Sequence, residues 1–182
     1  QAWMTIEFDR QTGEVFQMEG RSNQIPDLSL RRRIMPFLGH RPVILPGALP
    51  FVRGSDGTLL DIEDLPEVAD LSEFLNCREF QIPLHCEVLR VRGGAHIHNP
   101  SSLPRRIEIK GELRILWPRP DIVLPQSIVA DGGCTIYADA DAWAHRRDEV
   151  LALGADLRLP ISPASIPTSP LSFSSRRTSL GL

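Results

Sequence analysis

The segments VLRVRGGAHI (88–97), LPRRIEIKGELRI (103–115) and LPQSIVADGGCTI (124–136) decide the fold of this chain. Each segment places apolar residues at alternate positions on both sides of a central glycine. When the segments are aligned on Gly93, Gly111 and Gly132, they repeat at intervals of 18 and 21 residues, within the range of short solenoid repeats. The alignment predicts four apolar columns: Leu89/Ile107/Ile128, Val91/Ile109/Ala130, Ala95/Leu113/Cys134 and Ile97/Ile115/Ile136.

The repeated alternation predicts strands that bury one face and expose the other. Because the phase is the same in each segment, the strands can stack in register, and about three coils are needed to bury a continuous core. We therefore expect a mainly β fold, namely a short parallel β-solenoid of three to four coils. The stretch Leu151–Leu159 alternates again and predicts a degenerate fourth coil, with Leu153 aligned with Ala130.

The second and third segments both open on a Leu-Pro pair, Leu103-Pro104 and Leu124-Pro125, at the same phase. Proline is tolerated at the start of a strand, where its missing N–H costs little. This pattern resembles the short leucine-proline repeats of single-stranded β-solenoids in bacterial and phage-encoded proteins, and more distantly the polymer-forming β-helix of bactofilins. The resemblance covers Val88–Ile136 and implies a repeat architecture, which accompanies many functions.

The flanking regions predict elements that cap the two ends of the coils. We divide the chain into a cap region (1–79), a β-repeat domain (80–160) and a Ser/Pro-rich tail (161–182). In the cap region we expect a β-hairpin, a short helix that Asp27 caps and Pro36 ends, a proline-rich connector and an amphipathic helix. The predicted elements are the hairpin Thr5–Asp9 and Glu14–Met18, the connector His40–Phe51, the helix Pro66–Leu75, and a helix at 139–150, inserted in the repeat domain, with Trp143 and Val150 facing inward.

The amino-acid composition restricts the class of protein, but it says little about the activity of the protein. The 182 residues carry a net charge of −3, which favours neither nucleic acid nor a membrane as the partner. The three cysteines, Cys77, Cys86 and Cys134, are an odd set without CxxC spacing, so we expect a reducing, cytoplasmic location. The one basic run, Arg31–Arg33, predicts a solvated helix face.

Lys110 is the only lysine, beside 19 arginines. Codon bias in a GC-rich genome would produce this composition. Selection against ubiquitin-accepting lysines would produce it too, in a secreted effector, or its inhibitor, that acts inside a eukaryotic host. The composition leaves both explanations open.

His96-Ile97-His98 is the constellation that suggests metal chemistry. On a strand, residues two apart project from the same face, so the two histidines could bind one divalent transition metal. Cupin metalloenzymes use a similar pair inside an antiparallel jelly-roll barrel, and a cupin-like, metal-dependent enzyme is the alternative to the solenoid. The match ends with the pair, because no second histidine motif follows. We otherwise expect no cofactor, and we expect Cys134 to be a buried, inert thiol.

The outward positions of the repeats carry most of their charge, and we expect the functional surface there. The register predicts the ion pairs Arg90–Glu108 and Lys110–Asp131. The candidate binding residues are Arg90, Arg92, His96 and His98 on the first strand, Arg114 on the second strand, and Trp117 as an aromatic anchor at a coil corner. We find no motif for a nucleophile, a phosphate or a dinucleotide. The predicted function is a non-catalytic protein-binding or assembly module, a bacterial, plasmid or phage accessory protein that engages a protein partner or a second copy of itself.

Overall fold

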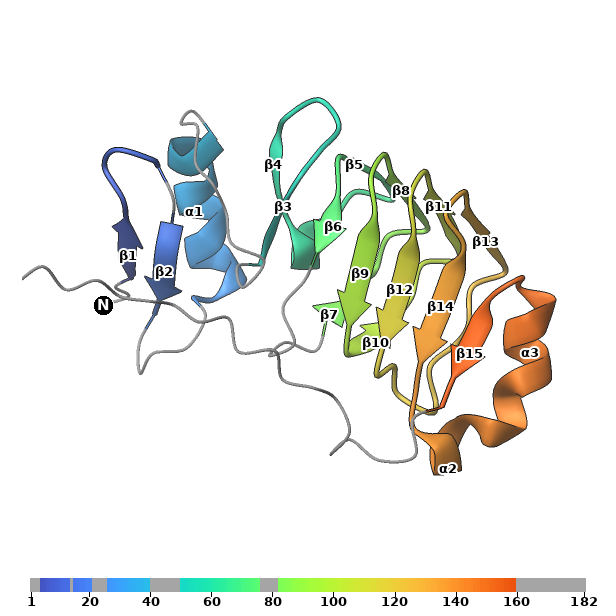
Figure 1. Cartoon of the computed structure of the whole chain (residues 1–182). Helices are drawn as coiled ribbons and strands as arrows, with labels where there is room; N and C mark the ends of the chain where they lie inside the picture. The colour runs from blue at the N-terminus through green and yellow to red at the C-terminus, as the bar shows by residue number, and fades with distance from the viewer. Residues whose placement is uncertain (1–3, 14, 21–25, 40–49, 76–81, 160–182) are drawn as a thin grey trace, which may run out of the picture.

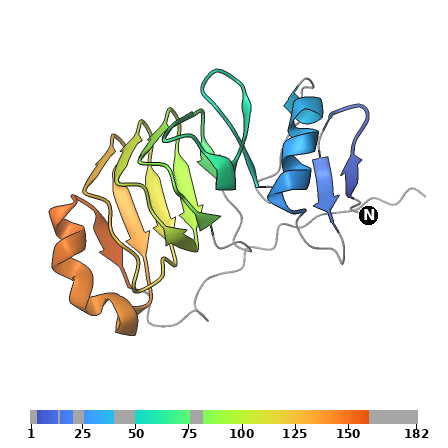
Figure 2. The same cartoon turned by 180° about the vertical axis from the view of Figure 1, so that it is seen from behind.

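The protein is mainly β, with parallel sheets. The computed structural model describes residues 4–13, 15–20, 26–39, 50–75 and 82–159. Figure 1 shows a stack of parallel strands at one end, a hairpin and a helix at the other end, and a second hairpin between them; Figure 2 shows the same order from behind. Most of the predicted connector 40–51 and all of the predicted tail 161–182 lie outside the described residues.

Two parallel sheets form the stack, and the chain alternates between them. We call the sheet with the order β13-β11-β8-β5 the first sheet, and the sheet with the order β15-β14-β12-β9-β6 the second sheet. The strands of the first sheet are β5 (Val68–Leu71), β8 (Val88–Val91), β11 (Arg106–Ile109) and β13 (Ser127–Ala130). The strands of the second sheet are β6 (Phe74–Leu75), β9 (Ala95–His98), β12 (Leu113–Leu116), β14 (Cys134–Tyr137) and β15 (Asp156–Arg158). A short parallel pair joins β7 (Ile82–Pro83) to β10 (Pro100–Ser102).

The parallel pairing contradicts the antiparallel jelly-roll or cupin-like alternative, which is wrong. Every ladder within the two sheets is parallel. A parallel connection needs the chain to cross over between paired strands. Here a strand of the other sheet supplies most of these crossovers, and the helical segment 140–152 supplies the one between β14 and β15.

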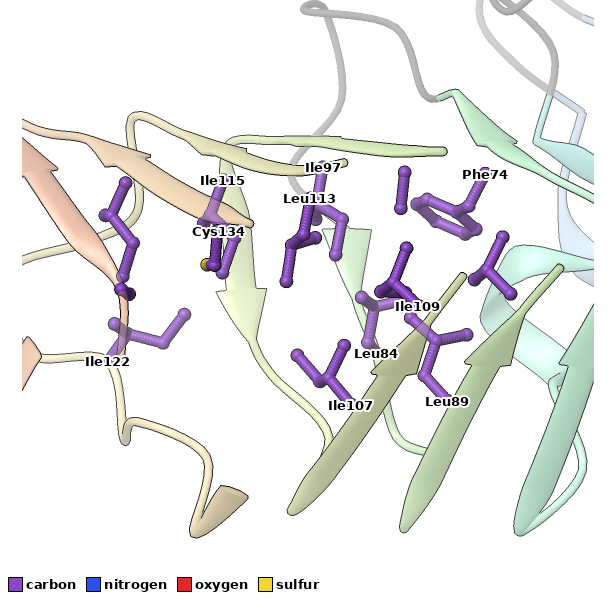
Figure 3. Packing of buried hydrophobic residues seen from close by; sticks show 14 of the residues in the cluster. Phe74, Leu84, Leu89, Ile97, Ile107, Ile109, Leu113, Ile115, Ile122 and Cys134 are labelled. Carbon is purple, nitrogen blue, oxygen red and sulfur yellow. The ribbon is translucent and has the colours of Figure 1, made fainter. Parts of the chain in front are cut away.

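The strand register confirms the four predicted apolar columns. In the first sheet Ile107 lies opposite Leu89 and Ile128. In the second sheet Ile115 lies opposite Ile97 and Ile136. Apolar side chains from both sheets fill the space between them, as Figure 3 shows. Burying these side chains is the main source of the stability of the stack.

The central glycine of each repeat forms a turn between two strands and does not lie inside one strand. A Cβ atom on Gly111 would lie 2.9 Å from both the carbonyl oxygen of Gly93 and the amide nitrogen of Gly94. A Cβ atom on Gly132 would lie 2.8 Å from the amide nitrogen of Glu112. The stacked turns therefore approach too closely for any side chain. The alternation survives the turn because an even number of positions separates Val91 from Ala95, the inward residues on its two sides.

The predicted helix Pro66–Leu75 is wrong, because these residues form β5 and β6. Apolar residues in this stretch fit a helical period as well as an alternating one, and pairing with the next strands decides between the two. Leu65-Pro66 precedes β5 at the spacing at which Leu103-Pro104 precedes β11. The Leu-Pro pair is thus a repeat signal that we missed. The parallel pairing begins at Val68, before the boundary expected at residue 80.

The inserted helix is confirmed as three short pieces, α2 (Ala140–Trp143), a 3₁₀ turn (Ala144–Arg146) and α3 (Arg147–Ala152). Asp139 caps α2 by accepting the N–H of Ala142 at 3.0 Å. Trp143 and Val150 are fully buried, as predicted. Arg146 holds this segment to the preceding loop, because its guanidinium stacks 4.7 Å from the Trp143 ring and donates to the Ile122 carbonyl at 2.8 Å.

The predicted fourth strand is shorter than expected and shifted. The expected alignment of Leu153 with Ala130 is wrong, because α3 extends to Ala152 and β15 begins only at Asp156. Leu157 lies opposite Ile136 instead. The shift from the expected register is two residues, so the apolar side chain stays on the inner face.

The N-terminal hairpin is confirmed as β1 (Thr5–Phe8) and β2 (Val15–Glu19), which pair antiparallel. Asp27 caps α1 (Leu28–Gly39), accepting the N–H of Leu30 at 2.9 Å. The prediction that Pro36 ends this helix is wrong, since α1 continues to Gly39. Pro36 lies on the exposed side, so the carbonyl that loses its N–H partner can bond to water.

A second hairpin covers the open edge of the first sheet. It consists of β3 (Phe51–Arg53) and β4 (Leu59–Asp61), followed by a 3₁₀ turn (Ile62–Asp64). The N–H of Ser55 donates to the Asp70 carbonyl at 2.8 Å, and the N–H of Ser72 donates to the Arg53 carbonyl at 3.0 Å. These bonds satisfy the edge of β5, which would otherwise pair with other chains.

A buried ion pair joins α1 to this second hairpin. Arg31 is 2% exposed and lies 2.9 Å from Asp61 and 2.9 Å from Glu63. The prediction that Arg31–Arg33 is wholly solvated is therefore wrong for Arg31. Burial raises the pKa of Asp61, whereas the N–H of Glu63 and the charge of Arg31 act against that rise.

Candidate binding surfaces on the two sheets

The glycine turn divides the predicted binding residues between two surfaces. Arg90 lies on β8 and Arg92 directly follows it, so both belong to the first sheet. His96 and His98 lie on β9, in the second sheet. The expectation that these four residues share one strand face is wrong, because the chain changes sheet at Gly93 and Gly94.

The outer face of the first sheet carries a charge ladder that crosses between strands. Asp70, Arg90 and Glu108 lie side by side on β5, β8 and β11. The Nε atom of Arg90 lies 2.8 Å from Glu108 Oε2, as predicted, and Arg106 Nη2 lies 3.1 Å from Glu108 Oε1. Glu108 is thus held by two arginines, which neutralise it.

A second polar row follows at the ends of the same strands. The N–H groups of Arg92, Lys110 and Asp131 donate to the carbonyls of the neighbouring strands, which places the three residues next to one another. Lys110 Nζ lies 3.6 Å from Asp131 Oδ2, which confirms that predicted pair. Arg92 Nη2 lies 3.4 Å from Asp70 Oδ2. In this row Arg92 and Lys110 are neighbours and Asp131 follows Lys110, whereas Asp70 approaches Arg92 from the first row.

A cavity of about 360 Å³ lies in this outer face, between the two polar rows. Its one strongly exposed apolar side chain is Val129, which is 58% exposed and takes the place on β13 that Glu108 holds on β11. The lining residues are Asp70, Arg90, Val91, Arg92, Glu108, Ile109, Lys110, Val129 and Asp131. The lining therefore combines charged side chains of both signs with one exposed apolar side chain.

The outer face of the second sheet is organised differently. We call one repeat of the chain, with its strands in the two sheets, a rung of the stack. The ion pairs of the second sheet form within one rung. Arg114 makes two hydrogen bonds of 2.8 Å to Glu112, two residues earlier in the chain. Arg158 makes the same kind of local pair with Asp156, also at 2.8 Å. Both pairs therefore join residues close together in the chain and do not link one strand to the next.

The two histidines share the outer face of the second sheet, as predicted. His96 lies between Leu75 on β6 and Arg114 on β12. Burial lowers the pKa of His96, and the charge of Arg114 lowers it further. The charge of Glu112, which is paired with Arg114, acts on the pKa of His96 in the opposite direction. Within the described part of the chain, no three His, Cys, Asp or Glu side chains gather to hold a metal.

Trp117 lies at a corner, as predicted, in an unusual backbone conformation. Its φ angle is 56°, and its N–H donates to the Tyr137 carbonyl at 2.7 Å. Asn99, at the same corner of the preceding rung, has a φ angle of 46°. Asparagine adopts this region readily, whereas a bulky residue does so at a cost. The Trp117 side chain is half-buried.

Sequence reasoning missed Asp70 and Val129 as parts of the surface. Asp70 was assigned to a helix, although the Leu-Pro repeat signal could have placed it on a strand. Val129 breaks the outward charge ladder, and that break was visible in the alignment. Cys134 is buried, as predicted, and burial raises its pKa to about 12. Burial likewise raises the pKa of Cys86 to about 11.

No protein-family model, curated protein or solved structure matches this chain. In the described residues, no helix has both the length and the apolar character needed to cross a membrane.

Proposed function

We propose that the two-sheet stack is a short β-solenoid that serves as a non-catalytic protein-binding or assembly module. The alternation between two parallel sheets and the recurrence of the inward columns at intervals of 18 and 21 residues support the solenoid. Solenoids present extended, regular outer surfaces, and such surfaces commonly bind proteins. The role as a bacterial, plasmid or phage accessory protein belongs to the same proposal.

One observation carries the proposal: the outer face of the first sheet combines cross-strand charges with a cavity. The inward residues recur because packing requires them, but the outward residues do not recur. Three side chains of this surface are well exposed, namely Arg92, Lys110 and Val129. The fold does not need two cations and an apolar side chain together at its surface. Tight interfaces commonly join an apolar contact to surrounding charges in this way. We therefore place the binding surface on the first sheet.

Affinity capture from the native host, followed by mass spectrometry, tests this function. The bait proteins are the wild type, the double variant Arg92→Glu/Lys110→Glu, and the control variant Arg158→Glu on the second sheet. Arg158 is a matched control, because its side chain is 65% exposed and that of Arg92 is 66% exposed. We expect a defined protein that the wild type and the control capture and that the double variant loses. Equal capture by all three baits would contradict the assignment to the first sheet.

A further inference from the structure

We infer that the cavity on the first sheet binds an acidic segment of a protein partner, with one carboxylate between Arg92 and Lys110 and an apolar side chain on Val129. This inference rests on the proposed function and adds the chemistry of the ligand. The charges around the cavity sum to nearly zero, so their net charge favours no ligand. The preference for an acidic ligand comes from where the individual charges lie.

The two cations that line the middle of the cavity, Arg92 and Lys110, are neighbours. The N–H of Arg92 donates to the Leu71 carbonyl, and the N–H of Lys110 donates to the Val91 carbonyl. Because Leu71 and Val91 lie opposite each other, Arg92 and Lys110 also occupy neighbouring positions on adjacent strands. Like charges at such positions repel each other. A carboxylate between them would remove that repulsion, and it would accept hydrogen bonds from both side chains.

The existing partners of these two cations hold them loosely. Arg92 is 3.4 Å from Asp70, and Lys110 is 3.6 Å from Asp131, whereas Arg90 is 2.8 Å from Glu108. The side chains of Arg92 and Lys110 are also 66% and 76% exposed. Exposed pairs at these distances contribute little free energy, so a ligand can draw the cations away at small cost.

Glu108, the carboxylate at the centre of the surface, repels an acidic ligand only weakly. Glu108 already accepts from Arg90 and Arg106, and this group of three carries a net positive charge. Asp70 and Asp131 lie on the two sides of the central cations. Their carboxylates would repel a continuous polyanion, such as nucleic acid or an anionic membrane, yet they leave room for a single carboxylate.

Val129 determines the second feature of the ligand, which is an apolar side chain. It is 58% exposed and lies beside Glu108, where the three preceding strands carry charged residues. An apolar side chain next to the ligand carboxylate would cover Val129 and remove its surface from water. The cavity therefore favours a short segment with an apolar residue next to Glu or Asp.

Lys110 makes this site directly observable, because it is the only lysine. Reductive methylation with ¹³C-formaldehyde labels its side-chain nitrogen and preserves the positive charge. A Lys110→Arg variant assigns the signal against that of the α-amino group. The probes are the peptides Ac-Gly-Leu-Glu-Gly-NH₂ and Ac-Gly-Leu-Gln-Gly-NH₂, which differ only in the carboxylate, and the readout is the ¹³C-methyl shift of Lys110 in the full chain.

We expect a saturable shift with the Glu peptide, and an affinity about tenfold lower for the Gln peptide, because a charge-assisted bond is lost. Arg92→Ser, which copies Ser72 of the preceding rung, should weaken the Glu peptide by about the same factor. The control Arg158→Ser should leave the affinity unchanged. An absent or non-saturable shift would overturn the inference, as would equal responses to both peptides or an equal loss in the two Ser variants.

This measurement is separate from the capture experiment. A selective response to the Glu peptide, without a captured protein, would refute the proposed function and leave the carboxylate site established. A captured partner that depends on the first sheet, without a selective response to the Glu peptide, would support the proposed function and refute an acidic ligand.

Discussion

The two sheets of the stack are alike on the inside and different on the outside. Both bury regular apolar columns, and the residues of successive rungs occupy equivalent places. Outside, Arg90–Glu108 and Lys110–Asp131 join different strands of the first sheet, whereas Arg114 and Arg158 of the second sheet pair with acids two residues away. The difference teaches that packing dictates the inner face, while the outer face is free to carry function.

The strongest test of the shared interior is the removal of one buried leucine from each sheet. Leu89→Ala in the first sheet and Leu113→Ala in the second should each lower the free energy of unfolding by about 2–5 kcal/mol, because both side chains are fully buried. Urea denaturation measures both. Val129→Ala, at an exposed position, should change it by less than about 0.5 kcal/mol. A large cost in one sheet only would show that the two sheets do not share one core.

The next largest effect concerns the turn that connects the sheets. Gly111→Ala should destabilise by about 1–3 kcal/mol, because the new Cβ atom would meet backbone atoms at 2.9 Å. Gly94→Ala is the matched control in a neighbouring turn, since its nearest contact would be an ordinary 3.5 Å. Thermal and urea unfolding compare the two. Equal stabilities would contradict the close stacking of the turns.

A smaller effect separates the two outer faces. A double-mutant cycle on Arg90 and Glu108 should give a coupling of about 0.2–1 kcal/mol, which 1 M salt reduces. The same cycle on Arg158 and Asp156, which lie on one strand, should give a smaller coupling. If the local pair proves to be the stronger one, the contrast between cross-strand and local charges has no energetic basis.

The smallest effect is the pH dependence that His96 of the second sheet contributes. Burial and Arg114 lower the pKa of His96 in the folded state, so below the ordinary histidine value of ~6.5 the unfolded chain takes up the proton first. Stability should therefore fall as the pH drops through that window, and level off below the lowered pKa. His96→Gln should show a weaker fall between pH 7.5 and pH 5 in urea titrations. An unchanged profile would mean that other groups set this dependence.

The sequence predicted the parts of the fold that repeat. Three rungs, their register and the inserted helix followed from the alternation, the Leu-Pro pairs and the inward positions of Trp143 and Val150. The sequence did not reveal that each repeat contains two strands, because the even spacing around Gly111 preserves the alternation through the turn. We also predicted a helix where β5 and β6 form, because their apolar residues fit a helical period when the neighbouring strands are ignored.

The candidate site was predictable only in part. The pairs Arg90–Glu108 and Lys110–Asp131 followed from the register alone. The grouping of Arg90 with His96 was wrong, because nothing local in the sequence shows that Gly93 and Gly94 redirect the chain into another sheet. The cavity beside Val129 depends on how side chains from four strands lie together, and this arrangement emerges only in three dimensions.

Site-specific photo-crosslinking in the native host tests the central claim, that the outer face of the first sheet binds a protein. A photoreactive amino acid replaces Val129 on the first sheet or, as the control, Thr135 on the outer face of the second sheet. The account predicts a discrete crosslinked protein from position 129 and none from position 135. Crosslinking from position 135 alone, or from neither position, would contradict it.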